Sequence, residues 1–211
     1  MWNYLATPIK RVTLTHLRWI NDFFTNIGIK YFVVEGPCLS IIRGGDTRSM
    51  TLPDNQDLDV YILKEDEPRD LVDKMVDAGW TNCFGGTVFN ERLYDRFKFY
   101  AWRTDGLDMC ALDLRFLFRY QNYRWSIILN KYCIYDDYLF HNARMVEVQG
   151  VTVSVPDPPE EYLRQEYGDD WMTPKNMHFY EYPCIHRAID IGFHSMLPKE
   201  DRYAYFNPSL L

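Results

Sequence analysis

The sequence predicts a single α+β domain in which a mixed β-sheet is flanked by helices. Segments with apolar residues at helical spacing alternate with short runs of β-branched and aromatic residues, and two further segments have the pattern of antiparallel hairpins. A length of 211 residues fits one compact domain. We expect a core over about residues 13–155 and a small helical or irregular C-terminal lobe over about residues 156–211.

Each element is predicted from its apolar pattern and from the residue that ends it. Gly28, Gly79 and Gly168 follow helical patterns, where glycine commonly ends a helix, and Gly150 marks the bend of a hairpin. From Asp169 onward the chain is aromatic, and we expect irregular structure there. In chain order the sequence predicts a helix over 13–27, a strand over 31–35, a short helix over 38–43, a strand over 57–63, a helix over 68–78, a hairpin over 92–118 with a turn at 104–106, a hairpin over 144–155 and a helix over 160–167.

Composition and charge exclude several classes of protein. A net charge of -7 and a pI near 5.2 argue against a general nucleic-acid binder, which needs a basic face. The sequence contains no apolar stretch of membrane-spanning length, no secretory signal segment and no N-glycosylation acceptor. We therefore expect a cytoplasmic protein, or one of the Golgi lumen if a leader has been removed. The five cysteines are widely spaced and odd in number, which predicts buried free thiols rather than disulfides.

Two aspartates at the beginning of the predicted strand 57–63 are the first candidates for a functional site. Side chains alternate across a strand, so Asp57 and Asp59 project from one face while Leu58 and Val60 enter the core. Paired carboxylates suit Mg²⁺ or Mn²⁺, whose coordination is completed by water and substrate phosphates. Taken in isolation, the same Asp-x-Asp pattern is also typical of a solvated pair or a turn cap.

Asp113 is the candidate for a third carboxylate because it interrupts an otherwise apolar predicted strand. An unpaired charge there would be costly, so Asp113 either completes the metal site or pairs with Arg115 or Arg103. Beside a metal, Asp113 is also placed to accept the proton of an acceptor hydroxyl.

The segment before Asp57 offers candidates for binding phosphate. Gly36 and Pro37 follow the strand 31–35 and begin a short helix, whose N-terminal N–H groups favour anions. Arg43 at the end of this helix is a candidate for a forked contact to a phosphate, and a surface arginine with no such role is equally compatible with its position.

These segments resemble the LicD/fukutin family, a branch of the nucleotidyltransferase superfamily with the DNA polymerase beta-type fold. Its members transfer phosphocholine, ribitol phosphate or related groups onto glycans. The family shows a glycine turn, a short helix ending in Arg, and then Pro-Trp-Asp-Asp-Asp-Ile-Asp. In this chain the corresponding residues follow in the same order: Gly36, Arg43, Pro53, Asp57 and Asp59.

The resemblance continues downstream. Asp113 is similar to a further Asp that the family carries on an apolar strand, and residues 155–174 (VPDPPEEYLRQEYGDDWMTP) resemble the family segment V-P-x-P-x-x-Y-L-x-x-x-Y-G-x-x-W-x-x-P. Tyr162, Tyr167 and Trp171 of this late segment either dock the last predicted helix or stack on the donor, and docking is the favoured interpretation.

The resemblance implies a nucleotidyltransferase fold and a Mg²⁺-dependent transferase. It would move a phospho-linked group, such as phosphocholine or an alditol phosphate, from a CDP-linked donor to the hydroxyl of a glycan or small molecule. One alternative is a nucleotidyltransferase that adds NMP to a small molecule or protein. Another is an inactive relative that binds a glycan or a nucleotide, which stays open because Asp54, Asn55 and Gln56 stand where the family commonly has Trp-Asp-Asp.

Overall fold

The structure is a computed structural model that describes most of the chain. It describes residues 9–10, 12, 14–44, 57–85, 88–89, 93–94, 96–102, 108–128, 131–174 and 181–198, with side chains described except in 9–10, 81–102 and 108–110. In chain order the elements are β1 (Ile9–Lys10), α1 (Leu14–Ile27), β2 (Tyr31–Val33), α2 (Glu35–Ile42), β3 (Asp57–Leu63), η1 (Lys64–Asp66), α4 (Leu71–Asp77), β4 (Thr81–Gly85), β5 (Val88–Phe89), β6 (Leu93–Tyr94), β7 (Arg96–Trp102), β8 (Asp108–Tyr120), β9 (Tyr123–Ile128), β10 (Lys131–Asp136), η2 (Asp137–Phe140), β11 (Ala143–Val148), β12 (Val151–Pro156), α5 (Pro159–Tyr167), α6 (Pro183–Asp190) and α7 (Phe193–Met196).

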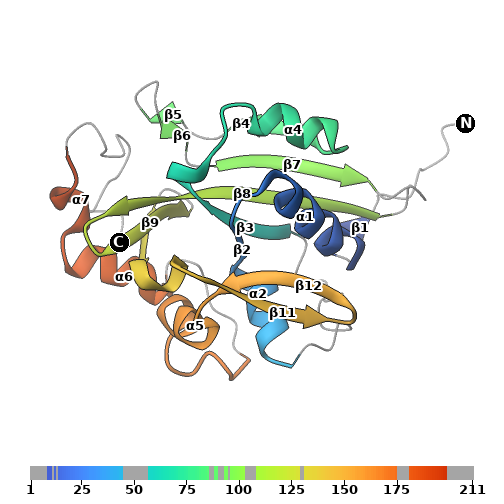
Figure 1. Ribbon diagram of the computed structural model, residues 1–211. Helices are drawn as coiled ribbons and strands as arrows, with labels where there is room; N and C mark the ends of the chain where they lie inside the picture. The colour runs from blue at the N-terminus through green and yellow to red at the C-terminus, as the bar shows by residue number, and fades with distance from the viewer. Residues whose placement is uncertain are drawn as a thin grey trace, which may run out of the picture.

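The central sheet is built around the long strand β8 (Figure 1). Its main path runs β10-β9-β8-β3-β2, in which β3 is parallel to β8 and the other pairs are antiparallel. Strand β7 pairs with β8 in antiparallel fashion and with β4 on its other side, and β1 also pairs with β8. Strands β11 and β12 form a separate two-stranded sheet, as do β5 and β6. The sheet is therefore mixed, as predicted for an α+β domain.

Most of the predicted elements are confirmed where the structure describes them. Strand β3 has the predicted limits, α1 differs from its prediction by one residue, and α5 ends at Gly168 as expected. The predicted antiparallel pairings of the two hairpins are present as β7–β8 and β11–β12, and Gly150 adopts φ 77 at the bend of the second. The turn predicted at 104–106 lies outside the described residues. Helix α2 begins at Glu35, three residues before its predicted start, because Gly36 and Pro37 lie inside its first turn.

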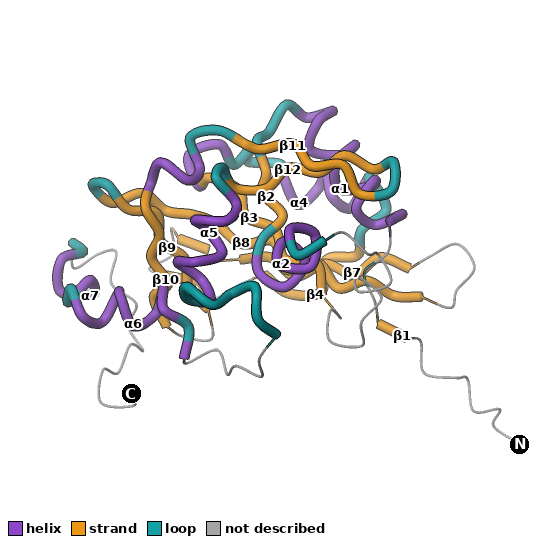
Figure 2. The backbone as a smooth tube through the Cα atoms, turned by 90° about the horizontal axis from the view of Figure 1, so that it is seen from below, coloured by secondary structure: helices purple, strands orange, loops and turns teal. Residues whose placement is uncertain are grey.

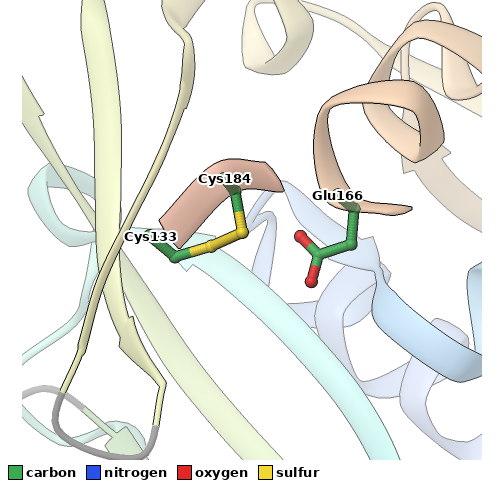
Figure 3. A group of neighbouring side chains, drawn as sticks. All are labelled: Cys133, Glu166 and Cys184. Atoms are coloured by element: carbon green, nitrogen blue, oxygen red, sulfur yellow. A yellow bond between two sulfur atoms is a disulfide. The ribbon is translucent and has the colours of Figure 1, made fainter. Parts of the chain in front are cut away.

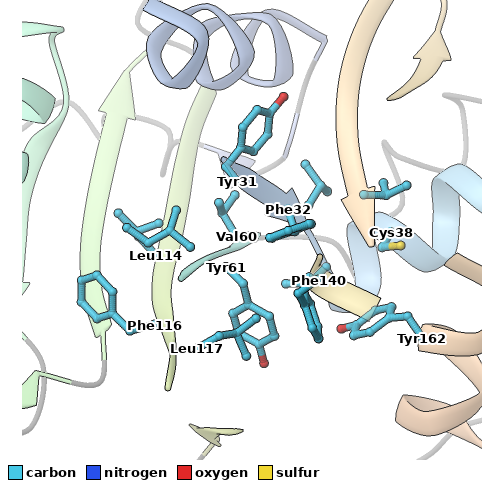
Figure 4. Packing of buried hydrophobic residues seen from close by; sticks show 14 of the residues in the cluster. Tyr31, Phe32, Cys38, Val60, Tyr61, Leu114, Phe116, Leu117, Phe140 and Tyr162 are labelled. Carbon is cyan, nitrogen blue, oxygen red and sulfur yellow. The ribbon is translucent and has the colours of Figure 1, made fainter. Parts of the chain in front are cut away.

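Different elements cover the two faces of the sheet near β2 and β3 (Figure 2). On one face α1 packs through Phe24, whose ring stacks on Tyr31 of β2 with the centroids 5.1 Å apart. On the other face the rings of Tyr61, Phe140 and Tyr162 form a row, with Phe140 between the other two (Figure 4). The three side chains are fully buried. This aromatic layer joins β3 to η2 and α5.

Gly79, which follows α4, has a position that only glycine fits. Its φ is 94, and a Cβ at this residue would lie 2.8 Å from Cζ2 of Trp19. Trp19 of α1 in turn meets the buried Trp80, with ring centroids 5.1 Å apart. The close approach of α1 to the end of α4 therefore depends on the missing side chain at Gly79.

The expectation of irregular structure from Asp169 onward is wrong for part of the tail. The tail forms two helices, α6 and α7, rather than purely irregular structure, because Cys184, Ile185 and Ala188 give α6 an apolar side that is buried.

The expectation of free thiols also fails for one pair of cysteines. Cys133 of β10 and Cys184 of α6 form a disulfide, although they are 51 residues apart in sequence. Their meeting depends on the packing of α6 against β10, which cysteine spacing does not reveal. Cys38 is a buried free thiol as expected, and the side chains of Cys83 and Cys110 lie outside the described part.

Candidate functional site

The three predicted carboxylates lie on one face of two neighbouring parallel strands. Asp59 of β3 is paired in register with Asp113 of β8, and Asp57 lies two residues earlier on β3 and therefore on the same face. Leu58 and Val60 are fully buried on the opposite face, as predicted. Paired residues on adjacent strands are ~5 Å apart. The fold thus brings Asp59 and Asp113 together, with Asp57 one step along the strand.

These carboxylates are largely buried but not sealed from solvent. The side chains of Asp59 and Asp113 are 14% and 10% exposed, and Asp57 is of intermediate exposure. Residues 45–56, which include Pro53, Asp54, Asn55 and Gln56, lie outside the described part of the chain. Their contribution to the site therefore stays a prediction.

Arg115, two residues after Asp113 on β8, lies among the carboxylates. Its Nη2 is 3.3 Å from Oδ2 of Asp113 and 3.4 Å from Oδ1 of Asp59, and its Nη1 forms an ion pair with Oε1 of Glu35. The ion pair between Asp113 and Arg115, which the sequence left open, is therefore present. Asp113 still belongs to the cluster of carboxylates, because the same guanidinium also pairs with Asp59.

The electrostatics of the cluster favour an additional cation. Burial raises the pKa of the Asp59 carboxyl well above its usual value, the negative charges of Glu35, Asp113 and Asp57 raise it further, and only Arg115 acts in the opposite direction. Three of these four carboxylates, those of Glu35, Asp59 and Asp113, pair with the one guanidinium of Arg115. Oxygen donors of this kind are the ligands that Mg²⁺ and Mn²⁺ prefer. Among the described residues, however, the group of three ligands whose atoms all lie within 4.8 Å of one another is Cys133, Glu166 and Cys184, and not the three aspartates, so a divalent cation at the aspartates stays a prediction.

Glu35 is a member of the cluster that the sequence did not reveal. It has φ 50, a left-handed conformation that costs a non-glycine residue ~1–2 kcal/mol. Its backbone N–H donates to the hydroxyl of Tyr162 at 3.0 Å, and its carboxylate accepts from the hydroxyl of Tyr61 at 3.3 Å besides pairing with Arg115. These contacts hold the turn before α2 in a conformation that the chain would otherwise avoid.

The first turn of α2 offers one amide to an anion. The N–H of Glu35 is used by Tyr162, Pro37 has no N–H, and the N–H of Cys38 donates to the carbonyl of Val34 at 3.2 Å. Gly36 is therefore the residue of this turn for which a contact between its N–H and a phosphate oxygen stays a prediction. Fewer N–H groups of this turn are therefore open to a phosphate than the sequence suggested.

The predicted phosphate ligand Arg43 has structural partners in the late segment. Its Nε donates to the carbonyl of Trp171 at 2.9 Å, and its Nη2 donates to the carbonyls of Trp171 and Thr173. Arg43 is the C-cap of α2 and Tyr162 binds Glu35 at the other end. Residues 155–174 therefore hold α2 at both of its ends, which gives a physical reason for the aromatic pattern in this segment.

A chain of buried polar groups extends from the cluster into the interior. The hydroxyl of Tyr61 lies 3.4 Å from that of Tyr135, and Tyr135 donates to Oε2 of Glu166. Burial raises the pKa of Glu166 to about 8, and the charge of Glu35 contributes in the same direction. Glu166 is completely buried. The carboxylate cluster is thus linked electrostatically to a second buried acid on α5.

A cavity in the described part of the chain lies at the other end of β3. It has a volume of about 280 Å³, and Lys64, directly after the last residue of β3, is part of its wall. Asp57 is the first residue of the same strand, so at ~3.3 Å per residue the two places are roughly 20 Å apart. The cavity is therefore distinct from the carboxylate cluster.

Sequence reasoning identified the three aspartates and named Arg115 as a possible partner of Asp113, but it missed Glu35 and the contact between Tyr162 and Glu35. Arg115 carried a local signal, because a residue two positions from Asp113 on a strand shares its face. Glu35 and Tyr162 carried none, since their contact joins residues 127 positions apart.

Comparisons with known proteins add no family to this description. The chain matches none of the protein families and none of the curated proteins with which it was compared. Among the described residues, no helix is both long and apolar enough to cross a membrane. The observed fold is a mixed α+β arrangement. The candidate site is defined by the positions of its residues on β3 and β8.

Proposed function

We propose that this protein is a metal-dependent transferase with a nucleotidyltransferase-type fold. It moves a phospho-linked group, such as phosphocholine or an alditol phosphate, from a CDP-type donor to a hydroxyl of a glycan or small molecule. The observation that carries the proposal is the pairing of Asp59 with Asp113 across two parallel strands, with Asp57 on the same face and the Gly36 turn adjoining it.

In this proposal each residue has a defined task. Asp57, Asp59 and Asp113 hold Mg²⁺ or Mn²⁺, and the N–H of Gly36 binds an oxygen of the donor phosphates. The bound metal would neutralise charge on the transferring phosphoryl group and lower the pKa of the attacking hydroxyl. The carboxylate of Asp113 accepts the hydroxyl proton. Arg115 fixes the carboxylates of Asp59 and Asp113 relative to each other.

Binding of donor and metal can be tested before the acceptor is known. A ligand that binds only the native state raises the unfolding midpoint. We expect CDP with Mg²⁺ to raise the midpoint of the wild type more than either does separately, and Asp59→Asn to lose this joint effect. Asp73→Asn, an exposed aspartate of α4, is the control and should respond like the wild type. An equal shift in Asp59→Asn would refute the assignment.

The product distinguishes the two kinds of transfer. A transferase of phospho-linked groups releases CMP from its donor, whereas addition of a nucleoside monophosphate releases pyrophosphate. Chromatography of the nucleotide products after incubation with CDP-linked donors or with CTP separates them, and we expect CMP. Formation of pyrophosphate from CTP, without CMP from any CDP-linked donor, would favour nucleotidyl transfer.

The contacts of Arg115 favour a second candidate function, an inactive relative that binds a nucleotide or glycan. A guanidinium paired with Glu35, Asp59 and Asp113 supplies positive charge where a metal would bind. If this cation replaces the metal, wild-type protein will bind cytidine nucleotides with equal affinity in Mg²⁺ and in a chelator. Isothermal titration under both conditions decides between the two candidates.

A further inference from the structure

A second cluster of potential ligands lies beyond Tyr61 and Tyr135, whose hydroxyls connect Glu35 to Glu166. Cys133 comes from β10, Cys184 from α6 and Glu166 from α5, and one ligand atom of each lies within 4.8 Å of the other two (Figure 3). The three residues are completely buried. In the structure the two sulfur atoms are joined as a disulfide.

The carboxylate of Glu166 is incompletely satisfied in this arrangement. Its Oε2 accepts from the hydroxyl of Tyr135, whereas its Oε1 is buried and has no hydrogen-bond partner within the described part of the chain. Figure 3 shows the carboxyl group directed toward the disulfide. A disulfide carries no S–H and cannot donate to it. A buried oxygen without a partner costs ~1–3 kcal/mol, so this place favours a group that Glu166 can bind.

Reduction would convert the cluster into a set of metal ligands. A phosphine reductant and one water molecule supply two electrons and two protons, which cleave the S–S bond to two thiols and leave a phosphine oxide. A divalent cation then displaces both thiol protons to solvent and binds two thiolates together with the Glu166 carboxylate. In tetrahedral zinc sites the Zn–S bonds are ~2.3 Å, which places ligand atoms roughly 4 Å apart. The Glu166 carboxylate lies within 4.8 Å of both sulfur atoms, and cleavage of the S–S bond allows the two sulfur atoms to move apart to this spacing.

We propose that reduced Cys133 and Cys184, with Glu166, form a buried site for a thiophilic divalent cation such as Zn²⁺. The hydroxyl of Tyr135 lies 3.2 Å from Sγ of Cys133 and is the nearest described candidate for a fourth donor. Thiolate ligands select zinc over magnesium. This site and the aspartate cluster therefore select different metals, and the disulfide is the metal-free state of the site.

The test uses the full chain with Mg²⁺ in excess, so that the aspartate cluster does not compete for zinc. Protein reduced with a phosphine is titrated with Zn²⁺ against a chromophoric chelator, and Co²⁺ is used to detect thiolate coordination through its near-ultraviolet charge-transfer absorption. We expect one tight Zn²⁺ site and a thiolate–Co²⁺ band in reduced wild type, and neither in the oxidised protein.

Variants separate this cluster from the other thiols of the chain. Cys184→Ser should lose the tight site, Glu166→Gln should bind Zn²⁺ at least ~10-fold more weakly, and Cys38→Ser, which changes a buried thiol outside the cluster, should bind like the wild type. Unchanged binding in folded Cys184→Ser would overturn the proposal.

A measurement on unaltered protein covers the case in which Cys184→Ser does not fold. The ¹¹³Cd NMR shift of reduced wild type loaded with cadmium should report thiolate ligands, and a shift typical of oxygen-only coordination would overturn the proposal. Asp59→Asn should leave Zn²⁺ binding intact, so failure here and failure of the transferase proposal are distinguishable.

Discussion

The contact between Tyr162 and Glu35 leads to a specific prediction for the Tyr162→Phe variant. The substitution deletes the hydroxyl that accepts from the backbone N–H of Glu35 at 3.0 Å and leaves the ring in place. A buried N–H that loses its acceptor costs ~1–3 kcal/mol. Because Glu35 has φ 50 and needs its contacts to stay in that conformation, we expect a loss in the middle of this range, ~2 kcal/mol.

The free energy of unfolding in urea, followed by tryptophan fluorescence, measures this effect. A loss of ~2 kcal/mol corresponds to roughly a 30-fold change in the folding equilibrium constant. The control is Tyr138→Phe, because Tyr138 is 47% exposed, and surface substitutions of this kind stay within ~0.5 kcal/mol. If Tyr162→Phe is as stable as Tyr138→Phe, Tyr162 does not hold the turn. The same variant should show a smaller joint shift with CDP and Mg²⁺, since the Gly36 turn would be less fixed.

Two further predictions concern stability. Gly79→Ala should lower the free energy of unfolding in urea by ~2–3 kcal/mol, because φ is 94 and the new Cβ would meet Trp19. Gly28→Ala is the control and should lose less, because Gly28 has φ 70 but open space around its Cβ position. Equal losses in the two variants would exclude the contact with Trp19 as the cause. Glu166 has a usual pKa of 4.5 and a folded pKa of about 8, so the folded state binds its proton more tightly and wild-type stability falls as pH rises across this range. The stability of wild type relative to Glu166→Gln should therefore fall by several kcal/mol as pH rises from ~4.5 to ~8 without reductant. A difference that does not change with pH, or a similar trend in the exposed control Glu160→Gln, would contradict the assignment.

The parts of the fold that could be predicted from the sequence are those set by local patterns. The alternation in DLDVYIL places Asp57 and Asp59 opposite Leu58 and Val60 without any knowledge of the neighbouring strands. Helix α5 carries its own end signal in Gly168. The prediction of Asp113 also rested on a local feature, a charge inside an apolar run.

The features that were missed depend on contacts between distant segments. Arg115 reaches Glu35 because β3 and β8 are in a particular register and the turn before α2 lies above them. The disulfide requires α6 to pack on β10. Neither arrangement leaves a pattern in the sequence near the residues concerned, so residue spacing does not predict them.

The central claim is that Asp57, Asp59 and Asp113 bind a divalent cation. Titration of Mn²⁺ into the protein, with unbound Mn²⁺ measured by electron paramagnetic resonance, tests it directly. We expect one site in the wild type that Mg²⁺ displaces, binding weakened at least ~10-fold in Asp59→Asn because one carboxylate ligand is lost, and wild-type binding in Asp73→Asn. Equal Mn²⁺ binding in Asp59→Asn and wild type, with both proteins folded, would contradict the account.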